Sequence, residues 1–503
     1  MTSQASYSTI LRSSAIIGGA QFTNILIGLV RIKMVALLLG PAGIGLLGFY
    51  TNLIQIAATV SGLGISTTGT RQIAAANAKG GTDAISLSRR ALFWGSLALA
   101  LTGGAIFWLA SGWIARVVLA DAGRSSEVAW LALGVTLTVA ASSQSALLTG
   151  LRRVGDLARV NVGAGIISTV LSVLALWALG DKALVLVALL GPGVGFVLGH
   201  VYVARLAKPS GPATSLTTMA PEWREMVALG LPFMLSGLVM TLGQLLVRTI
   251  LQRELGLGAA GYFQAAWAIG MMYLGFILGA MGTDYYPRLA ALIRDAREAT
   301  SLVNEQTEVA LLLLAPVLLA LLGLSPWVIA LLYSAEFGPA VEVLRWQLLG
   351  DVFKVLSWPL AMVLTAAGAG KTFFLMESAA MLTFVVMTFL GIPYLGVAAT
   401  GVGFLAMYGV HLPLVWIAAR RLIDFRWRRS VRWQAIAVIL ATVTVDVVSR
   451  ADDFVGAVVG LVLAFAFGLW ALLRLAERSG AKGRLGRLAA LGQKLNGRLA
   501  RKT

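Results

Sequence analysis

Two arginines, Arg31 and Arg248, lie inside stretches of sequence that are otherwise almost wholly apolar. If these stretches cross a bilayer, each buried cation costs about 2.5–3.5 kcal/mol on insertion scales, and the protein must gain something that offsets that cost. A guanidinium is planar and forms charge-assisted, often bidentate hydrogen bonds with anionic oxygens. The two arginines therefore predict a site that binds an anionic group within the membrane; the alternative is that they only anchor the outer interface.

The arginines belong to polar stripes that follow helical spacing. Gln21, Asn24 and Arg31 are separated by three and seven positions, so they share one face of a helix. Two further segments carry comparable stripes, made of Asn52, Gln55, Thr59, Ser66 and Thr70, and of Thr241, Gln244 and Arg248. We expect the three stripes to line one water-filled cavity. The predicted binding residues are Arg31, Arg248, Gln21, Asn24, Asn52, Gln55 and Gln244.

Acidic residues inside apolar runs are candidates for coupling transport to an ion. Asp284 and Glu377 have no obvious partner nearby in the sequence, so each is a candidate to titrate or to bind a cation, with a gate salt bridge or a water-exposed helix end as the alternative. Asp351 and Lys354 are three positions apart and are expected to form a structural ion pair, although both stay candidates for coupling.

Four other polar residues are expected near the ends of their spans. Lys33 lies about 200° around the helix from Arg31 and is expected to snorkel to the outer interface. Asp446, His200 and His411 are expected at wet or interfacial positions. None of them is predicted to bind the ligand or to relay protons.

Composition identifies the solvent around these stripes. Of the 503 residues, 58% are hydrophobic and only 12% are charged, whereas ordinary soluble domains carry about 25% charged residues. We predict an all-α, polytopic membrane protein with about fourteen spans, each long enough to cross a hydrocarbon core of about 30 Å. The expected spans are 12–38, 44–70, 91–118, 128–150, 158–179, 183–204, 226–252, 258–287, 307–333, 341–368, 372–391, 395–419, 433–449 and 454–473.

Charge and residue usage limit the other classes. Most lysines and arginines fall on alternate connections of these spans, which predicts that both termini are cytoplasmic. The net charge of +18 is therefore explained by membrane topology, and no nucleic-acid partner is predicted. The chain has no cysteine and two histidines far apart, so we predict no disulfide, no metal site and no cofactor.

A weak internal repeat organises the chain. Residues 31–71 and 248–288 share an initial arginine, a glycine-rich turn and a similar ending. We expect two six-helix lobes around a central cavity. The predicted domains are an N-lobe at 1–206, a cytoplasmic linker at 207–225, a C-lobe at 226–421, two further helices at 422–474 and a basic tail at 475–503. Leucines at helical spacing favour either a surface helix on an anionic leaflet or a disordered basic segment for this tail.

These motifs also resemble a known family. A cationic first helix, the turn at Leu39, Gly40, Pro41, Gly43, Gly45 and Leu46, and a second helix that closes on Gly62, Leu63, Gly64 and Arg71 resemble the Wzx-type O-antigen and polysaccharide flippases of the multidrug/oligosaccharidyl-lipid/polysaccharide (MOP) exporter superfamily. The stretch LLLGPAGIGLLGFYTNLIQIAATVSGLG is most similar to the enterobacterial common antigen flippase subgroup. The usual twelve helices would cover 12–420, and the two extra helices are more like those of lipid II flippases.

The resemblance implies a function. It implies alternating-access translocation of an undecaprenyl-diphosphate-linked oligosaccharide, an O-antigen or exopolysaccharide repeat unit, from the cytoplasmic to the periplasmic leaflet of the bacterial inner membrane. The protein is then not an enzyme, works as a monomer among membrane lipids, and has a polysaccharide polymerase and assembly proteins as candidate partners. The alternatives are a cation-coupled multidrug exporter and a lipid II flippase of the same superfamily. A membrane polymerase would need a large periplasmic loop, and the outer connections here are short.

Overall fold

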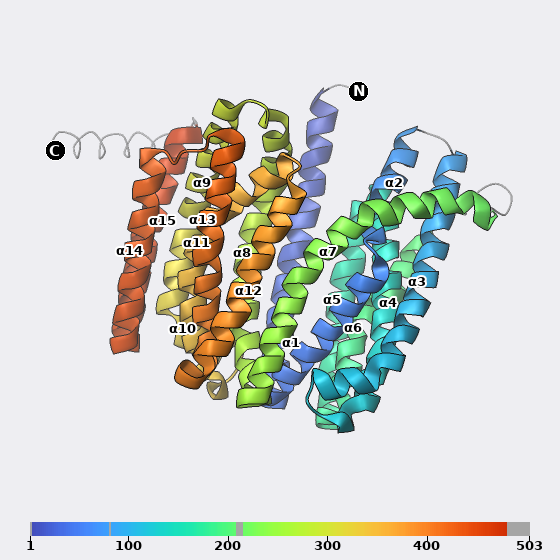
Figure 1. Ribbon diagram of the computed structural model, residues 1–503, viewed down its shortest axis with the longest axis horizontal. Helices are drawn as coiled ribbons and strands as arrows, with labels where there is room; N and C mark the ends of the chain where they lie inside the picture. Colours follow the sequence, from blue (N-terminus) through green and yellow to red (C-terminus); the bar gives the residue numbers. More distant parts are fainter. Residues whose placement is uncertain (1–2, 80–81, 208–214, 480–503) are drawn as a thin grey trace. The chain divides into compact units, whose positions relative to one another are not determined.

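The computed structural model describes residues 3–79, 82–207 and 215–479, and every element in these ranges is helical (Figure 1). The predicted all-α class is therefore confirmed. The elements are α1 (Ser3–Gly62), α2 (Ile65–Lys79), α3 (Thr82–Val117), η1 (Ala122–Arg124), α4 (Ser125–Gly150), α5 (Val154–Leu179), η2 (Gly180–Ala183), α6 (Leu184–Ala204), α7 (Leu216–Leu255), α8 (Leu257–Leu292), α9 (Ala296–Gly323), α10 (Ser325–Leu332), η3 (Ala335–Phe337), α11 (Pro339–Ala366), α12 (Gly370–Leu395), η4 (Gly396–Ala398), α13 (Ala399–Ile423), α14 (Arg429–Ala451) and α15 (Asp453–Ser479).

The helices expose many large apolar side chains on their outer surface. Ten helical segments within the described ranges are long and apolar enough to cross a membrane. Trp177, Tyr394 and Phe465, for example, are 79%, 87% and 75% exposed. So much exposed apolar surface is unfavourable in water and favourable in a bilayer. The chain is thus a multi-pass membrane protein. The count of about fourteen spans stays a prediction, because three of the ten segments, Thr23–Gly62, Val154–Ala204 and Gly370–Ile423, each contain two helices.

Helix α1 is too long to be one straight span. Its 60 residues would extend about 90 Å, three times the hydrocarbon thickness of about 30 Å. Gly40 breaks the helix with φ 62° and ψ −170°, a backbone conformation that glycine adopts without steric cost, and the chain reverses direction there (Figure 1). The turn was predicted at this place, but it is tighter than expected: a single residue leaves helical geometry before Pro41 resumes it.

The reversal at Gly40 packs directly against the start of α8. A methyl group at Gly261 would overlap the backbone carbonyl of Pro41, and a methyl group at Gly45 would overlap the carbonyl of Leu257. The two backbones can approach this closely only because both helices present glycine at the crossing. The glycine-rich turn of the sequence is therefore a packing motif as well as a turn.

The chain divides into two compact units, each with its own core. The first unit contains residues 1–264 and the short segment Leu332–Phe337, and the second contains Ala265–Leu331 and residues 338–503. Phe49 and Tyr50 are fully buried in the core of the first unit, and Tyr285 and Phe425 in that of the second. The division falls inside α8, beyond the expected linker at 207–225. The predicted lobes at 1–206 and 226–421 stay a proposal.

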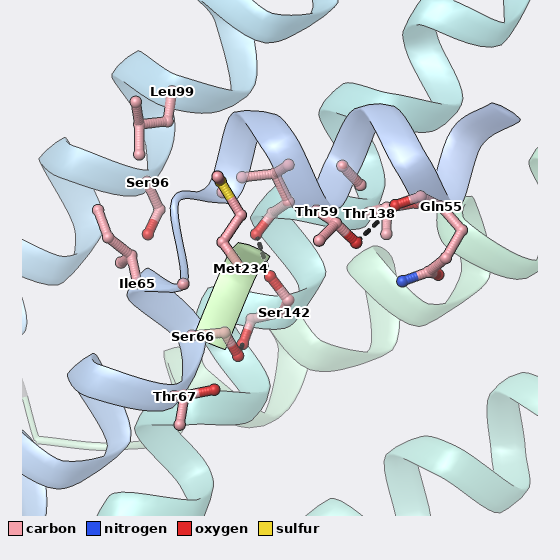
Figure 2. A pocket seen from close by; sticks show the side chains of 14 residues that line it. Gln55, Thr59, Ile65, Ser66, Thr67, Ser96, Leu99, Thr138, Ser142 and Met234 are labelled. Carbon is pink, nitrogen blue, oxygen red and sulfur yellow. Dashed lines mark hydrogen bonds between the residues drawn. The ribbon is translucent and has the colours of Figure 1, made fainter. Parts of the chain in front are cut away.

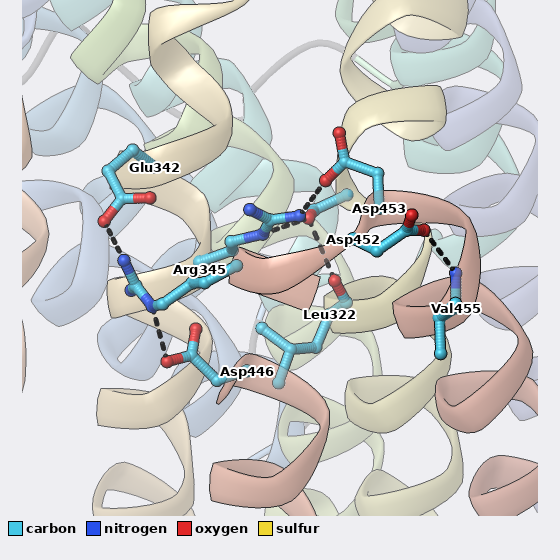
Figure 3. A network of polar contacts seen from close by, with 9 residues as sticks. Leu322, Glu342, Arg345, Asp446, Asp452, Asp453 and Val455 are labelled. Carbon is cyan, nitrogen blue, oxygen red and sulfur yellow. Dashed lines mark hydrogen bonds and ion pairs between the residues drawn. The ribbon is translucent and has the colours of Figure 1, made fainter. Parts of the chain in front are cut away.

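Helices α14 and α15 are tied to the second unit by an ionic network (Figure 3). The buried guanidinium of Arg345 in α11 lies 2.6 Å from a carboxylate oxygen of Asp453 at the start of α15. Arg450 of α14 binds both Asp446, at 2.8 Å, and Glu342 of α11. The expectation that Asp446 is wet was wrong: it is 6% exposed, because Arg450 one turn later covers and neutralises it.

We expect Gly261→Ala to destabilise the protein, because its methyl group has no room beside Pro41. Overpacking of this kind costs about 1–3 kcal/mol. Gly258→Ala is the matched control in the same helix, since nothing lies within 4 Å of the added carbon. The measurement is the apparent melting temperature of the purified protein. Equal melting temperatures for the two variants would contradict the close approach of α1 and α8.

Candidate functional site

A polar cavity in the first unit surrounds Arg31. It has a volume of about 420 Å³ and lies among α1, α4, α5 and α6. Arg31 is half-buried, and its Nη2 makes one long hydrogen bond, 3.5 Å, to the carbonyl oxygen of Val187. The polar residues lining this cavity besides Arg31 are Thr51, Gln55, Thr138, Ser142, Ser145 and Asn161. The lining contains no Asp or Glu, so the cavity combines one positive charge with neutral hydroxyl and amide groups.

A second polar cavity adjoins the first. It has a volume of about 310 Å³, and Gln55, Thr138 and Ser142 line both (Figure 2). Beyond these shared residues it is lined by the hydroxyls of Thr59, Ser66, Thr67 and Ser96. The two cavities together form a polar track that runs from Arg31 past the break between α1 and α2.

The hydroxyls of this track are set up mainly as acceptors. Thr138 donates to the carbonyl of Gly134 at 2.7 Å, and Ser142 donates to that of Val139 at 2.8 Å. Each hydroxyl has one donor hydrogen and two lone pairs, so these bonds leave the oxygens to accept from a ligand. The guanidinium of Arg31 supplies donors at the other end. The track can therefore bind a ligand that carries both an anionic group and hydroxyl groups.

The predicted residues of the first two stripes are only partly brought together. Arg31 of the first stripe and Gln55 of the second line the same cavity. Asn24 lies against α5, where a methyl group at Gly165 would come within 3.0 Å of its Oδ1. Asn52 is 8% exposed and lines neither cavity, and its Oδ1 is buried without a hydrogen-bond partner. Gln21 lies in α1, but its side chain falls outside the described part of the structure.

Arg248 does not face this track. It is 3% exposed, donates to Gln264, and lies with its guanidinium carbon 5.6 Å from the ring centroid of Phe263. Its Nε and Nη1 have no hydrogen-bond partner among the described residues. Gln244, one turn earlier on α7, is half-buried and lines neither cavity of the track. The expected common cavity is thus represented by Arg31 of the first stripe and by Gln55, Thr59 and Ser66 of the second, and not by the α7 stripe.

Lys33 also differs from expectation. It does not reach outward along the surface, because its Nζ donates to the backbone carbonyl of Tyr333 at 2.6 Å. Tyr333 belongs to Leu332–Phe337, the short segment that joins the first unit. This backbone acceptor, close in space but distant in sequence, offsets the cost of placing the ammonium group inside the protein. The Lys33 side chain therefore does not need to snorkel to the interface.

The predicted ion pair between Asp351 and Lys354 is not formed. Asp351 is fully buried and accepts a hydrogen bond of 2.5 Å from the hydroxyl of Tyr273. Lys354 instead lies over two aromatic rings, with Nζ 5.6 Å from the centroid of Phe404 and 5.4 Å from that of Tyr408. Partners from other helices replace the neighbour in sequence, since cation–π contact and a phenolic donor both satisfy a buried charge.

Beside these residues lies a second pair, made of a buried histidine and a half-buried glutamate. The Nε2 of His411 is 3.2 Å from Oε1 of Glu377, and the ring of His411 packs edge-on against Tyr408 at 5.8 Å. His411 is 3% exposed, so its expected interfacial position was wrong. Gln347 completes the group from α11, with both side-chain amide atoms buried and without a partner among the described residues. The second unit therefore contains a cluster of titratable groups in a dry environment.

The remaining candidates are more exposed. Asp284 pairs with Arg288 one turn later, at 3.1 Å, and its side chain is 75% exposed, which matches the alternative of a wet helix end. His200 is exposed and stacks on Phe196, as expected for an interfacial position.

Several site residues were missed by sequence reasoning. Thr138, Ser142 and Ser145 were not chosen, although their spacing of four and three gives the same stripe signal as α1. Asn161 is a single amide in an apolar helix and gives no periodic signal. Tyr273 and Gln347 could not be assigned, because their significance depends on contacts between helices.

The fold and the polar track define a multi-pass membrane protein with a polar cavity among its helices, and comparison with known proteins gives the family. The chain belongs to the polysaccharide biosynthesis protein family, whose sequence profile matches residues 10–293. The lipid III flippases of Escherichia coli (strain K12) and Shigella flexneri are each 23% identical to it over 400 residues, which cover 77% of this chain and 92% of theirs.

Solved structures show the same fold. A lipid II flippase, MurJ, in an inward-closed conformation is 12% identical with a TM-score of 0.69, over 91% of this chain and 98% of its own. An inward-facing multidrug resistance MATE family transporter of the MOP superfamily is 17% identical with a TM-score of 0.63, over 80% and 94%. The matched proteins are flippases and transporters, and the chain is accordingly not an enzyme.

We expect the polar track to be accessible to water in the membrane-embedded protein. The chain has no cysteine, so single cysteines can be read without background. Ser145→Cys, in the cavity lining, should react with a small charged thiol reagent, whereas Val135→Cys, at a fully buried position on the same helix, should not. The measurement is the rate of labelling in membranes. If the cysteine at position 145 were labelled as slowly as the one at position 135, the cavity would be closed to water.

Proposed function

We propose that the chain is a flippase that moves a polyprenyl-diphosphate-linked oligosaccharide across the bacterial inner membrane. The passenger is an undecaprenyl-diphosphate-linked repeat unit of O-antigen or exopolysaccharide, carried from the cytoplasmic to the periplasmic leaflet, with both termini of the protein cytoplasmic. The observation that carries the proposal is the polar track: one guanidinium among hydroxyls and amides, with no acidic residue in its lining.

Each part of such a passenger has a chemical counterpart in the track. Arg31 can hold diphosphate oxygens through charge-assisted bonds, and its hydrogen bond to the carbonyl of Val187 is a long one that a phosphate oxygen can replace. The hydroxyls of Thr138 and Ser142 accept from sugar hydroxyls. The polyprenyl chain can stay in lipid throughout, so the protein needs to shield only the polar head. Alternating access of two lobes then releases the head on the other side.

The rival functions fit the track less well. A multidrug exporter that takes cationic drugs needs acidic groups in its binding site, and the lining of this track has none. A lipid II flippase is the closer alternative, because lipid II presents the same diphosphate and sugar chemistry. We favour a passenger of the enterobacterial common antigen type, because the sequence of the first two helices resembles that flippase subgroup. Complementation of defined flippase deletions with different repeat units distinguishes these passengers.

Energy for transport is proposed to come from the membrane potential or from a proton or sodium gradient. The candidates are the cluster of the second unit, with the buried Asp351 and the half-buried Lys354 and Glu377, and the exposed Asp284. We favour this cluster, because burial of a carboxylate such as Asp351 makes its charge state sensitive to its surroundings. The protein is proposed to act as a monomer that passes its product to a polysaccharide polymerase and assembly proteins.

Removing the cation from the track should stop translocation. We expect Arg31→Ala to lower the rate at least about tenfold, since a hydrogen bond to a charged group contributes about 1.5–3 kcal/mol. Arg31→Lys should restore part of the activity, because it keeps the charge but loses the planar fork. Lys182→Ala, an exposed lysine outside both cavities, is the control.

The measurement is the appearance of lipid-linked oligosaccharide in the outer leaflet, normalised to protein in the membrane. Full activity of Arg31→Ala, or a loss matched by loss of protein, would show that Arg31 is a structural anchor.

Neutralising the buried cluster should uncouple transport from its ion. Asp351→Asn keeps an acceptor for the Tyr273 hydroxyl but removes the charge, and Glu377→Gln does the same beside His411. We expect at least one of them to flatten the dependence of translocation on external pH or sodium, whereas Asp284→Asn should leave it intact. Wild-type ion dependence in both cluster variants would remove this cluster from the coupling mechanism.

A further inference from the structure

A pocket separate from the polar track opens among α3, α4 and α6 of the first unit. It has a volume of about 290 Å³, at the lower end of the range for small-molecule sites. Its polar lining is basic: Arg89 and Arg90 of α3 and His200 of α6, together with Gln144 of α4. Its apolar lining includes Phe93 and Leu147. The lining contains no Asp or Glu, so the pocket favours an anion.

This pocket and the polar track lie on opposite sides of α4. Ser142 and Ser145 line the track, whereas Ser143, Gln144 and Leu147 line the pocket. Each residue of a helix advances about 100°, which separates the two groups by about half a turn. A ligand in the pocket is therefore not on a path along the track. This geometry argues against the transported passenger as the occupant.

The surroundings of the pocket are those of a membrane interface. Phe93 is 57% exposed and packs edge-on against Trp94, which is 51% exposed. The guanidinium of Arg205, just after α6, lies 4.8 Å from the ring centroid of Tyr202. Exposed aromatic rings beside basic groups mark the level of lipid headgroups. An anion that reaches this pocket most readily is one already held in the bilayer.

Arg89 has a structural role that prepares the pocket. It donates to the carbonyl of Val203 in the last turn of α6 and to that of Ala207, just beyond the helix. The carbonyl end of a helix carries partial negative charge and would repel an anion, and the guanidinium covers that charge. A guanidinium has five N–H donors, so these two bonds leave others for a ligand. The end of α6 thus becomes compatible with a phosphate.

We propose that this pocket binds the phosphate of an anionic phospholipid, with Arg89, Arg90 and His200 around the headgroup and an acyl chain along Phe93. Basic pockets between membrane helices are suited to such headgroups. The site goes beyond the translocation function, because its ligand is a resident lipid that is bound and not transported.

The test is native mass spectrometry of the full-length protein in a neutral detergent, titrated with phosphatidylglycerol. We expect binding to weaken about fivefold for each guanidinium removed in Arg89→Gln, Arg90→Gln. Arg420→Gln, Arg421→Gln is the matched control, since it removes two adjacent exposed arginines of α13 that lie outside this pocket. Phosphatidylcholine should bind much more weakly than phosphatidylglycerol to the wild-type protein.

A fall in the melting temperature of the double variant would reflect the lost bonds between Arg89 and the end of α6. In that case the single variant Arg90→Gln tests the proposal, with an expected fivefold loss of phosphatidylglycerol affinity. Unchanged phosphatidylglycerol affinity in Arg90→Gln and in a folded double variant would overturn the proposal. Two competition results would also overturn it: displacement of phosphatidylglycerol by equimolar undecaprenyl diphosphate would assign the pocket to the passenger, and displacement by equimolar inorganic phosphate would assign it to a free anion.

Discussion

The structure depends on one constraint: a polar group inside a bilayer finds no water and must be satisfied by the protein itself or by what the protein carries. Several charged side chains within the helices obey it through a partner on another helix. Arg345 binds Asp453, Asp351 accepts from Tyr273, and Glu377 faces His411. Arg31 and Arg248 are two exceptions: Arg31 makes only a long bond to a carbonyl and faces a cavity, and Arg248 has two buried nitrogens without a partner among the described residues. The exception that lines a cavity, Arg31, identifies the candidate site.

Helical periodicity was enough to predict the fold class and one side of this site. Apolar runs of span length gave the all-α membrane fold, and the spacing of Arg31 and Gln55 within two adjacent spans led to the same cavity. The Gly40–Pro41 turn was also visible, because glycine followed by proline interrupts a helix in a recognisable way. These features depend only on residues near one another in the sequence.

Partners from distant helices could not be predicted in this way. Asp351 and Lys354 are three positions apart, yet each turns to groups on other helices. His411 is buried by a glutamate that precedes it by 34 positions, and no local pattern indicates this pairing. Asp446 is a different case, since its partner Arg450 is four positions later and the signal was present in the sequence. Distance along the chain, more than chemistry, separates what could be predicted from what could not.

The two faces of α4 have a consequence for how the sequence can change over evolution. One face supplies Thr138, Ser142 and Ser145 to the track, and the other supplies Ser143, Gln144 and Leu147 to the basic pocket. A single inserted or deleted residue before this stretch would rotate every later side chain by about 100° and exchange lining for packing on both sides at once. Substitutions can accumulate one at a time on either face. Insertions and deletions cannot accumulate in this way. We therefore expect related proteins to differ in the residues of α4 but not in the length of this stretch.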